Sequence, residues 1–191
     1  MEDSSARNLD PAVVAGFGDE WSRFSNREIG PEELAEMFDA YAAVFPWDDL
    51  PPEPVGFDAG CGSGRWATFF AARVGHLHCV DASSEALEVA RRSLVGRSNV
   101  TFHHATLEEM PLEPGSCDFG YSLGVLHHIP DTESALRACV DRLRPGAPFL
   151  VYLYYRLDGV GPLRRVLFRL VTLVRRVVSR LPGRVRSMVA D

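Results

Sequence analysis

Short apolar runs alternate with segments of helical periodicity between residues 55 and 155 of this 191-residue chain. The apolar runs predict five strands, at residues 55–58, 77–80, 99–103, 117–122 and 148–155. The periodic segments predict helices at residues 64–74, 84–94 and 131–143, with Ser83 or Ser84 capping the second. Strands that alternate with helices predict an α/β fold with a doubly wound, mostly parallel sheet of about five strands.

Residues 1–50 are expected to form a cap ahead of this sheet. Residues 1–30 read as irregular, with an aromatic cluster in GFGDEWSRF. From Pro31 the sequence PEELAEMFDAYAAVF has an acidic first turn and one apolar stripe, which predicts a helix. The proline-rich residues 46–54 end that helix and form a stiff connector. The core domain is therefore expected to span residues 51–155.

Residues 156–191 differ from the rest of the chain in charge. They carry nine arginines and two aspartates, whereas residues 1–155 carry 11 arginines and 24 acidic residues. Residues 163–181, LRRVLFRLVTLVRRVVSRL, place their apolar side chains on one helical face, which predicts a basic amphipathic helical tail. Three alternatives are open for the apolar face: packing on the chain's own domain, contact with an anionic membrane surface, or self-association through residues 148–181.

The overall composition is that of a globular protein, with 46% hydrophobic residues, 24% charged residues and a net charge of −6. The acidic, polar start has no signal-peptide pattern, and no uncharged run reaches transmembrane length. The four cysteines form no CxxC pair, so buried free thiols are expected and no metal site. We expect a cytoplasmic protein, membrane-peripheral if its tail binds lipid, with no nucleic-acid partner.

A glycine-rich loop follows the first predicted strand, in the sequence VGFDAGCGSGRW of residues 55–66. Glycine is needed where a Cβ would collide with a closely approaching group or where φ is positive. A dinucleotide-binding fingerprint would place its third glycine at the position of Arg65, and a P-loop would need a lysine, which the chain does not contain. The remaining pattern is an acidic residue followed by three glycines at alternate positions.

This pattern resembles motif I of the class I S-adenosylmethionine-dependent methyltransferases. The blocks HLHCVDAS, SCDFGYSLGVLHHIPD and LRPGAPFLVYLYY agree with further family blocks in order and spacing. The resemblance covers about residues 10–155 and is greatest to the small-molecule enzymes of the ubiquinone-methyltransferase-like group. It implies a Rossmann-like core at residues 51–155 that binds S-adenosylmethionine, and methyl transfer to a small-molecule acceptor.

The resemblance also implies a set of cofactor-binding residues. Asp58 matches the acid that engages the methionyl ammonium, Asp81 matches the acid that accepts both ribose hydroxyls, and Ser122 corresponds to a contact near the methionyl group. The family usually has Gly-Asp-Ala after the third strand, whereas this chain has Ala105-Thr106-Leu107, so the Thr106 hydroxyl and the Leu107 amide are expected to serve the adenine. The full set is Asp58, Gly60, Gly62, Gly64, Asp81, Thr106, Leu107 and Ser122.

His127 and His128 are the candidates for a catalytic base, because the ordinary pKa of histidine is near neutrality. The alternative is that one of them packs beneath the site, since an acidic acceptor needs no dedicated base. Phe17 and Trp21 belong to a segment that resembles one lying over the cofactor in related enzymes, where aromatic faces would attract a sulfonium.

Three functions are open at this point. The first is a methyltransferase; the others are a cofactor-binding module without catalysis and a membrane-peripheral protein that uses the fold as a scaffold. The family sheet normally ends in two further strands, which residues 156–191 do not predict. The exposed edge at residues 148–155 would then be covered by the helical tail or by a partner chain, or the chain is a truncated piece of a longer methyltransferase, which is the favoured alternative. Neither the acceptor nor the methylated atom, oxygen, nitrogen or carbon, follows from the sequence.

Overall fold

The structure, a computed structural model, describes residues 8–23 and 29–154. The chain divides into two compact units, Met1–Leu153 and Tyr154–Asp191, and the fold described here is that of the first. The predicted helix of residues 163–181 lies outside the described residues, and the expected domain boundaries stay predictions. None of the described helices has the length and apolar character needed to span a bilayer.

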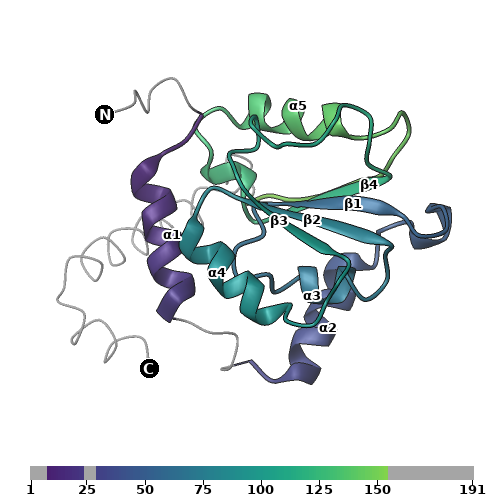
Figure 1. Ribbon diagram of the computed structural model, residues 1–191, viewed down its shortest axis with the longest axis horizontal. Helices are drawn as coiled ribbons and strands as arrows, with labels where there is room; N and C mark the ends of the chain where they lie inside the picture. Colours follow the sequence, from purple (N-terminus) through teal and green to yellow (C-terminus); the bar gives the residue numbers. More distant parts are fainter. Residues whose placement is uncertain (1–7, 24–28, 155–191) are drawn as a thin grey trace, which may run out of the picture. The chain divides into compact units, whose positions relative to one another are not determined.

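The predicted doubly wound sheet is confirmed (Figure 1). Its five strands are β1 (Val55–Ala59), β2 (His76–Asp81), β3 (Val100–His104), β4 (Phe119–Leu123) and β5 (Phe149–Tyr152). The strand order is β3-β2-β1-β4-β5, and every neighbouring pair is parallel. The order reverses between β1 and β4, and ligands of such sheets bind at the carboxyl ends of the strands next to this point. The glycine loop follows β1 and therefore lies at this point.

The helices differ from the sequence prediction in two places. They are α1 (Pro11–Arg23), α2 (Pro31–Ala42), α3 (Ala67–Phe70), α4 (Ser84–Ser93) and α5 (Thr132–Arg142), with short 3-10 turns η3 (Trp47–Asp49) and η4 (Leu126–His128). The expectation that residues 1–30 are irregular is wrong, because Asp10 accepts the Ala12 amide at 2.9 Å and begins a helix at Pro11. The helix expected at residues 64–74 is regular only at α3. Ser83 caps α4, accepting the Ala86 amide at 3.2 Å.

Each face of the sheet has its own hydrophobic cluster. Phe38 of α2, Phe70 of α3 and Leu87 of α4 pack on one face with side chains of β2 and β4. The opposite face is covered by α5, whose Ala135 and Cys139 pack with side chains of β1 and β2. Figure 1 shows α5 on one side of the sheet and α3 and α4 on the other. The core is thus a sheet buried on both faces, which explains the nearly continuous apolar strands.

The two central strands, β1 and β4, interlock through glycine and phenylalanine pairs. Gly56 is opposite Phe119, and Phe57 is opposite Gly120. A Cβ on Gly56 would lie 2.3 Å from the Phe119 ring, and a Cβ on Gly120 would lie 2.4 Å from the Phe57 ring. Each phenylalanine therefore lies over the glycine of the neighbouring strand, one pair on each face, and the positions tolerate no larger residue.

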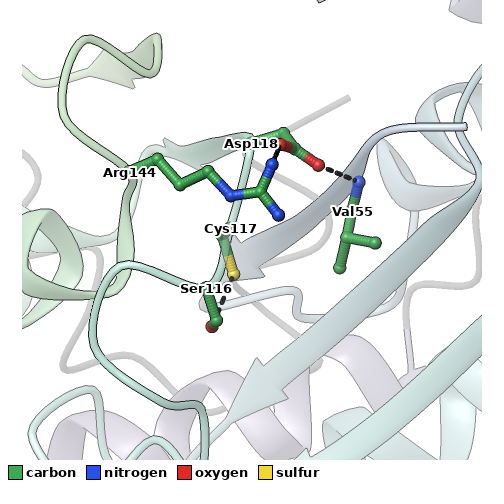
Figure 2. A network of polar contacts seen from close by, with 5 residues as sticks. All are labelled: Val55, Ser116, Cys117, Asp118 and Arg144. Atoms are coloured by element: carbon green, nitrogen blue, oxygen red, sulfur yellow. Dashed lines mark hydrogen bonds and ion pairs between the residues drawn. The ribbon is translucent and has the colours of Figure 1, made fainter. Parts of the chain in front are cut away.

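At the amino-terminal edge of the sheet, Asp118 joins β1 to the segments before β4 and β5 (Figure 2). Its carboxylate accepts the Val55 amide at 2.8 Å and forms an ion pair with Arg144. The Arg144 amide in turn donates to the Cys117 carbonyl at 2.9 Å. Asp118 and Arg144 also line a cavity of about 240 Å³ together with several prolines. This edge is opposite to the carboxyl ends of the strands, where the candidate site lies.

Candidate functional site

The glycine loop folds back over the carboxyl end of β2. The amides of Gly60 and Cys61 both donate to the Val80 carbonyl, at 2.8 and 3.0 Å. The Gly62 amide donates to Asp81 Oδ2 at 2.8 Å. The loop after β1 and the acid at the end of β2 are therefore one hydrogen-bonded unit, as the sequence prediction of a shared site requires.

All three loop glycines have positive φ, at 81° for Gly60, 53° for Gly62 and 74° for Gly64. A Cβ on Gly60 would lie 2.4 Å from a methyl group of Val125, and a Cβ on Gly64 would lie 3.1 Å from the Cβ of Ala90. Gly60 and Gly64 are thus required by backbone conformation and by packing within the protein. Their contact with a cofactor stays a prediction.

Asp81 is held by two backbone amides. Its Oδ2 accepts Gly62 N–H and its Oδ1 accepts Ser83 N–H, each at 2.8 Å. Burial raises the pKa of Asp81, and the hydrogen bonds from Ser83 and Gly62 oppose that rise. A carboxylate has about four acceptor positions, so these bonds do not use all of them. The binding of a ribose by Asp81 stays a prediction.

Asp58 lies in the middle of a buried row of side chains across the sheet. Its register partners are Cys79 on β2 and Tyr121 on β4, and its own exposure is 3%. Burial raises the pKa of Asp58 to about 8; the Tyr121 hydroxyl lowers it, and the charge of Asp81 raises it further. The carboxyl is therefore mostly protonated at pH 7 and would ionise if a cation were placed beside it.

The two residues expected at the adenine are both buried. The Thr106 hydroxyl accepts the Glu109 amide at 3.3 Å and donates to Glu109 Oε2 at 3.2 Å, so it is engaged within its own turn. Leu107 belongs to the cluster beneath α5. The Ala105 amide donates to the Asp81 carbonyl at 3.1 Å, which keeps this turn next to Asp81. The contacts of Thr106 and Leu107 with adenine stay predictions.

The remaining predicted residues follow β4. Ser122 is fully buried and donates its hydroxyl to the Ala59 carbonyl at 2.9 Å, so its side chain joins β4 to β1. His127 and His128 lie in η4 with ring centroids 4.0 Å apart. Burial lowers the pKa of both histidines, which keeps them neutral at pH 7 and able to accept a proton. The roles of Ser122 and of the two histidines stay predictions.

The N-terminal cap contacts the loops of this edge through Asn8, which the sequence did not single out, and through Phe17, which it did. Asn8 donates to Glu108 Oε1 at 2.6 Å and to the Asp131 carbonyl at 2.7 Å, and it accepts the Asp131 amide at 2.7 Å. Phe17 packs edge-on against His128 at 4.8 Å between ring centroids. Helix α1 also contacts α4. Phe17 is thus beside the candidate base; the side chain of Trp21 lies outside the described part.

Among the described residues, no group of three or more histidine, cysteine or acidic side chains could hold a metal ion. The cysteines Cys61, Cys79, Cys117 and Cys139 are free and buried. His78 and His103 approach each other across β2 and β3, with Nδ1 and Nε2 3.0 Å apart. This pair lies on neighbouring strands rather than in the loops of the candidate site.

Comparison with known families identifies the domain. Residues 57–151 match the family model described as a methyltransferase domain. The ubiquinone biosynthesis O-methyltransferase of Aromatoleum aromaticum is 37% identical to the chain over 144 residues. The chain belongs to the class I S-adenosylmethionine-dependent methyltransferases. Both the family and its ubiquinone-methyltransferase-like group are as the sequence resemblance implied, and the cofactor is S-adenosylmethionine.

Solved structures of methyltransferases have the same fold. A sarcosine dimethylglycine methyltransferase described as putative, from Galdieria sulphuraria, superposes with a TM-score of 0.60 at 22% identity, over 71% of this chain and 54% of its own. The YcgJ protein of Bacillus subtilis gives 0.59 at 26% identity, over 76% of this chain and 58% of its own. The alignment with the Aromatoleum relative covers 73% of this methyltransferase chain and 60% of the relative, so the chain spans less than two thirds of that protein.

Proposed function

We propose that the chain transfers a methyl group from S-adenosylmethionine to a small-molecule acceptor. The observation that carries this proposal is the bond between the Gly62 amide and Asp81, which joins the glycine loop to the carboxylate at the end of β2. Asp81 would hold the ribose hydroxyls, and the buried carboxyl of Asp58 would hold the methionyl ammonium. Thr106, Leu107 and Ser122 would line the adenine and methionyl parts.

The cofactor supplies an activated methyl group on a sulfonium, so the protein has mainly to bind, orient and exclude water. The amide bonds to Asp81 fix the carboxylate before binding, which reduces the ordering cost. The α1 segment, held by Asn8 and by the contact of Phe17 with His128, would exclude water from the same edge. His128 is in the neutral form needed to take a proton from an acceptor hydroxyl.

For the acceptor we propose a hydroxylated aromatic ring that is methylated on oxygen. The Aromatoleum relative is named a ubiquinone biosynthesis O-methyltransferase. Three aromatic side chains support the idea, because the Tyr41 ring lies 5.2 Å from that of Trp66 and 5.0 Å from that of Tyr152. Trp66 follows the glycine loop and Tyr152 ends β5, so these rings form a wall at the carboxyl edge that suits a planar substrate.

Calorimetric titration with S-adenosylmethionine and with S-adenosylhomocysteine tests the cofactor site. Asp81→Ala is expected to weaken both by at least about tenfold, because charge-assisted hydrogen bonds contribute about 1.5–3 kcal/mol. Glu88→Ala, an exposed acid of α4, is the matched control and should bind normally. Unchanged binding by Asp81→Ala, or no binding by the unaltered chain at millimolar ligand, would contradict the proposal.

Turnover against a panel of phenols and catechols then tests the acceptor and separates an enzyme from a cofactor-binding module. Methylated products should form, and Tyr152→Ala should raise KM for the acceptor more than for the cofactor. Cofactor binding with no product from any acceptor would favour the module without catalysis. No cofactor binding at all would favour the third alternative, a scaffold.

Localisation and further partners stay predictions from the sequence. We propose a cytoplasmic protein whose basic tail gives it either a membrane-peripheral location or a self-association surface, and the charge of residues 156–191 supports the first. Co-sedimentation with anionic and neutral vesicles tests this, using a variant with Arg164, Arg165, Arg175 and Arg176 changed to glutamine. Equal binding by the variant and the unaltered chain would exclude lipid electrostatics.

A further inference from the structure

We propose that Tyr121 is a positioning residue for the cofactor's ammonium group, acting by donating its hydroxyl to the ionised carboxylate of Asp58. This inference rests on the proposed function, in which Asp58 receives the methionyl ammonium. It concerns a residue of β4 to which the sequence resemblance assigned no role.

The sheet register places the Tyr121 side chain beside Asp58. The two residues are paired on neighbouring strands β1 and β4, so both side chains leave the same face of the sheet at the same level. Cys79 of β2 is the partner of Asp58 on its other side. Asp58 is thus bordered by a phenol and by a thiol, and the phenol is the stronger hydrogen-bond donor.

Packing holds the Tyr121 ring in one orientation. The residue is fully buried, and its ring stacks on Phe70 of α3 with centroids 3.8 Å apart and planes inclined by 15°. Within the described part of the chain, no group forms a geometrically complete hydrogen bond with the Tyr121 hydroxyl. A buried hydroxyl without such a bond is costly, so a group that can complete it is expected nearby. The carboxyl of Asp58 is that group.

The charges around Asp58 favour a cationic ligand. The titratable groups that face it are Tyr121 from β4, Cys79 and Asp81 from β2, and Cys61 from the glycine loop. None of these groups carries a positive charge, so none competes with a cationic ligand. The Tyr121 hydroxyl is the side chain that lowers the pKa of Asp58. Burial raises the pKa of Tyr121 well above its ordinary value, so it remains a donor throughout the physiological range.

The protonated carboxyl of Asp58 and the adjacent phenol of Tyr121 together suit the binding of an ammonium group. Without a ligand, the protonated carboxyl needs no cation and the phenol is held beside it. When an ammonium group arrives, Asp58 releases its proton to solvent, and the carboxylate accepts the Tyr121 hydroxyl on one side and the ammonium on the other. A hydroxyl that is already placed costs little ordering at that moment. Cofactor binding is then linked to proton release.

Tyr121→Phe tests the inference, because it keeps the ring and its stacking and removes only the hydroxyl. Calorimetry with S-adenosylhomocysteine between about pH 6 and 8.5 is expected to show affinity rising with pH for the unaltered chain, as Asp58 ionises. Tyr121→Phe should bind about tenfold more weakly at neutral pH, with its pH profile displaced to higher pH. Tyr154→Phe, which removes the hydroxyl of an exposed tyrosine, is the matched control and should leave the profile unchanged.

Three outcomes decide the matter. An affinity and pH profile of Tyr121→Phe equal to those of the unaltered chain would overturn the inference while leaving the proposed function intact. If Tyr121→Phe lost as much affinity for adenosine, which has no ammonium group, the inference would also be overturned. The substitution would then weaken binding without acting on the ammonium group. Failure of the unaltered chain to bind S-adenosylhomocysteine would instead overturn the proposed function.

A second readout needs no change at Tyr121. The phenol absorbance of the unaltered chain should shift when S-adenosylhomocysteine binds, and the shift should be absent in Asp58→Asn at saturating ligand. An identical shift in both proteins would contradict the inference even if Tyr121→Phe failed to fold.

Discussion

Removal of the Asp118 carboxylate should destabilise the fold much more than removal of its ion-pair partner. Asp118 is 8% exposed and accepts the Val55 amide in a partly buried hydrogen bond, whereas the Arg144 side chain is 55% exposed. Loss of a hydrogen bond to a charged group, with a partly buried N–H left unpaired, costs about 2–4 kcal/mol. The half-exposed ion pair contributes only about 0–1 kcal/mol.

Urea unfolding followed by tryptophan fluorescence measures both effects. We expect Asp118→Ala to lose about 2–4 kcal/mol of unfolding free energy and Arg144→Ala less than about 1 kcal/mol. Asp118→Asn keeps an acceptor for the Val55 amide and should fall between them. Equal losses in Asp118→Ala and Arg144→Ala would refute the reasoning, since the ion pair rather than the amide bond would then hold this edge together.

Three further predictions concern the loops and the sheet edge. Gly60→Ala should abolish cofactor binding in calorimetry and lower the melting temperature, because φ is positive there and the new methyl group would meet Val125; normal binding would contradict this. Asn8→Asp should speed amide exchange in residues 8–18, since a second carboxylate would then face Glu108, and Asn8→Asp with Glu108→Gln should restore protection. Burial lowers the pKa of His78 to about 4, whereas its pKa in the unfolded chain is near 6.5. The free energy of unfolding should therefore fall as the pH drops from about 6.5 towards 4. In His78→Gln, the urea concentration at the unfolding midpoint should depend less on pH over this range.

The fold could be predicted because its signal is local. Apolar runs between turn residues gave all five strands to within a few residues, and Ser83 as a cap is a pattern of neighbouring positions. Helix α1 was not predicted because its glycines and aromatic residues are not typical of a helix, although Asp10 and Pro11 form a helix start. The short α3 follows from Gly64 and Arg65 turning the chain before a regular helix begins at Ala67.

The candidate site could be predicted only in part. Asp58 and Asp81 stand in motifs that a sequence displays directly. The partnership of Asp58 with Tyr121 depends on the register between strands 63 residues apart, which no single-sequence pattern contains. The role of Asn8 could not be predicted for the same reason, because only the fold brings its partners Glu108 and Asp131 next to it.

The interlock of Gly56 with Phe119 and of Phe57 with Gly120 has a consequence for how the chain reaches its native state. The two strands that meet there are 63 residues apart, so their contact closes a large loop and belongs to the slow, non-local part of folding. A slip of one residue would set Phe57 opposite Phe119 in one direction, or Gly56 opposite Gly120 in the other, so a steric clash or a void would replace the native pairs. The interlock therefore favours the native register of β1 and β4 over a slip of one residue in either direction.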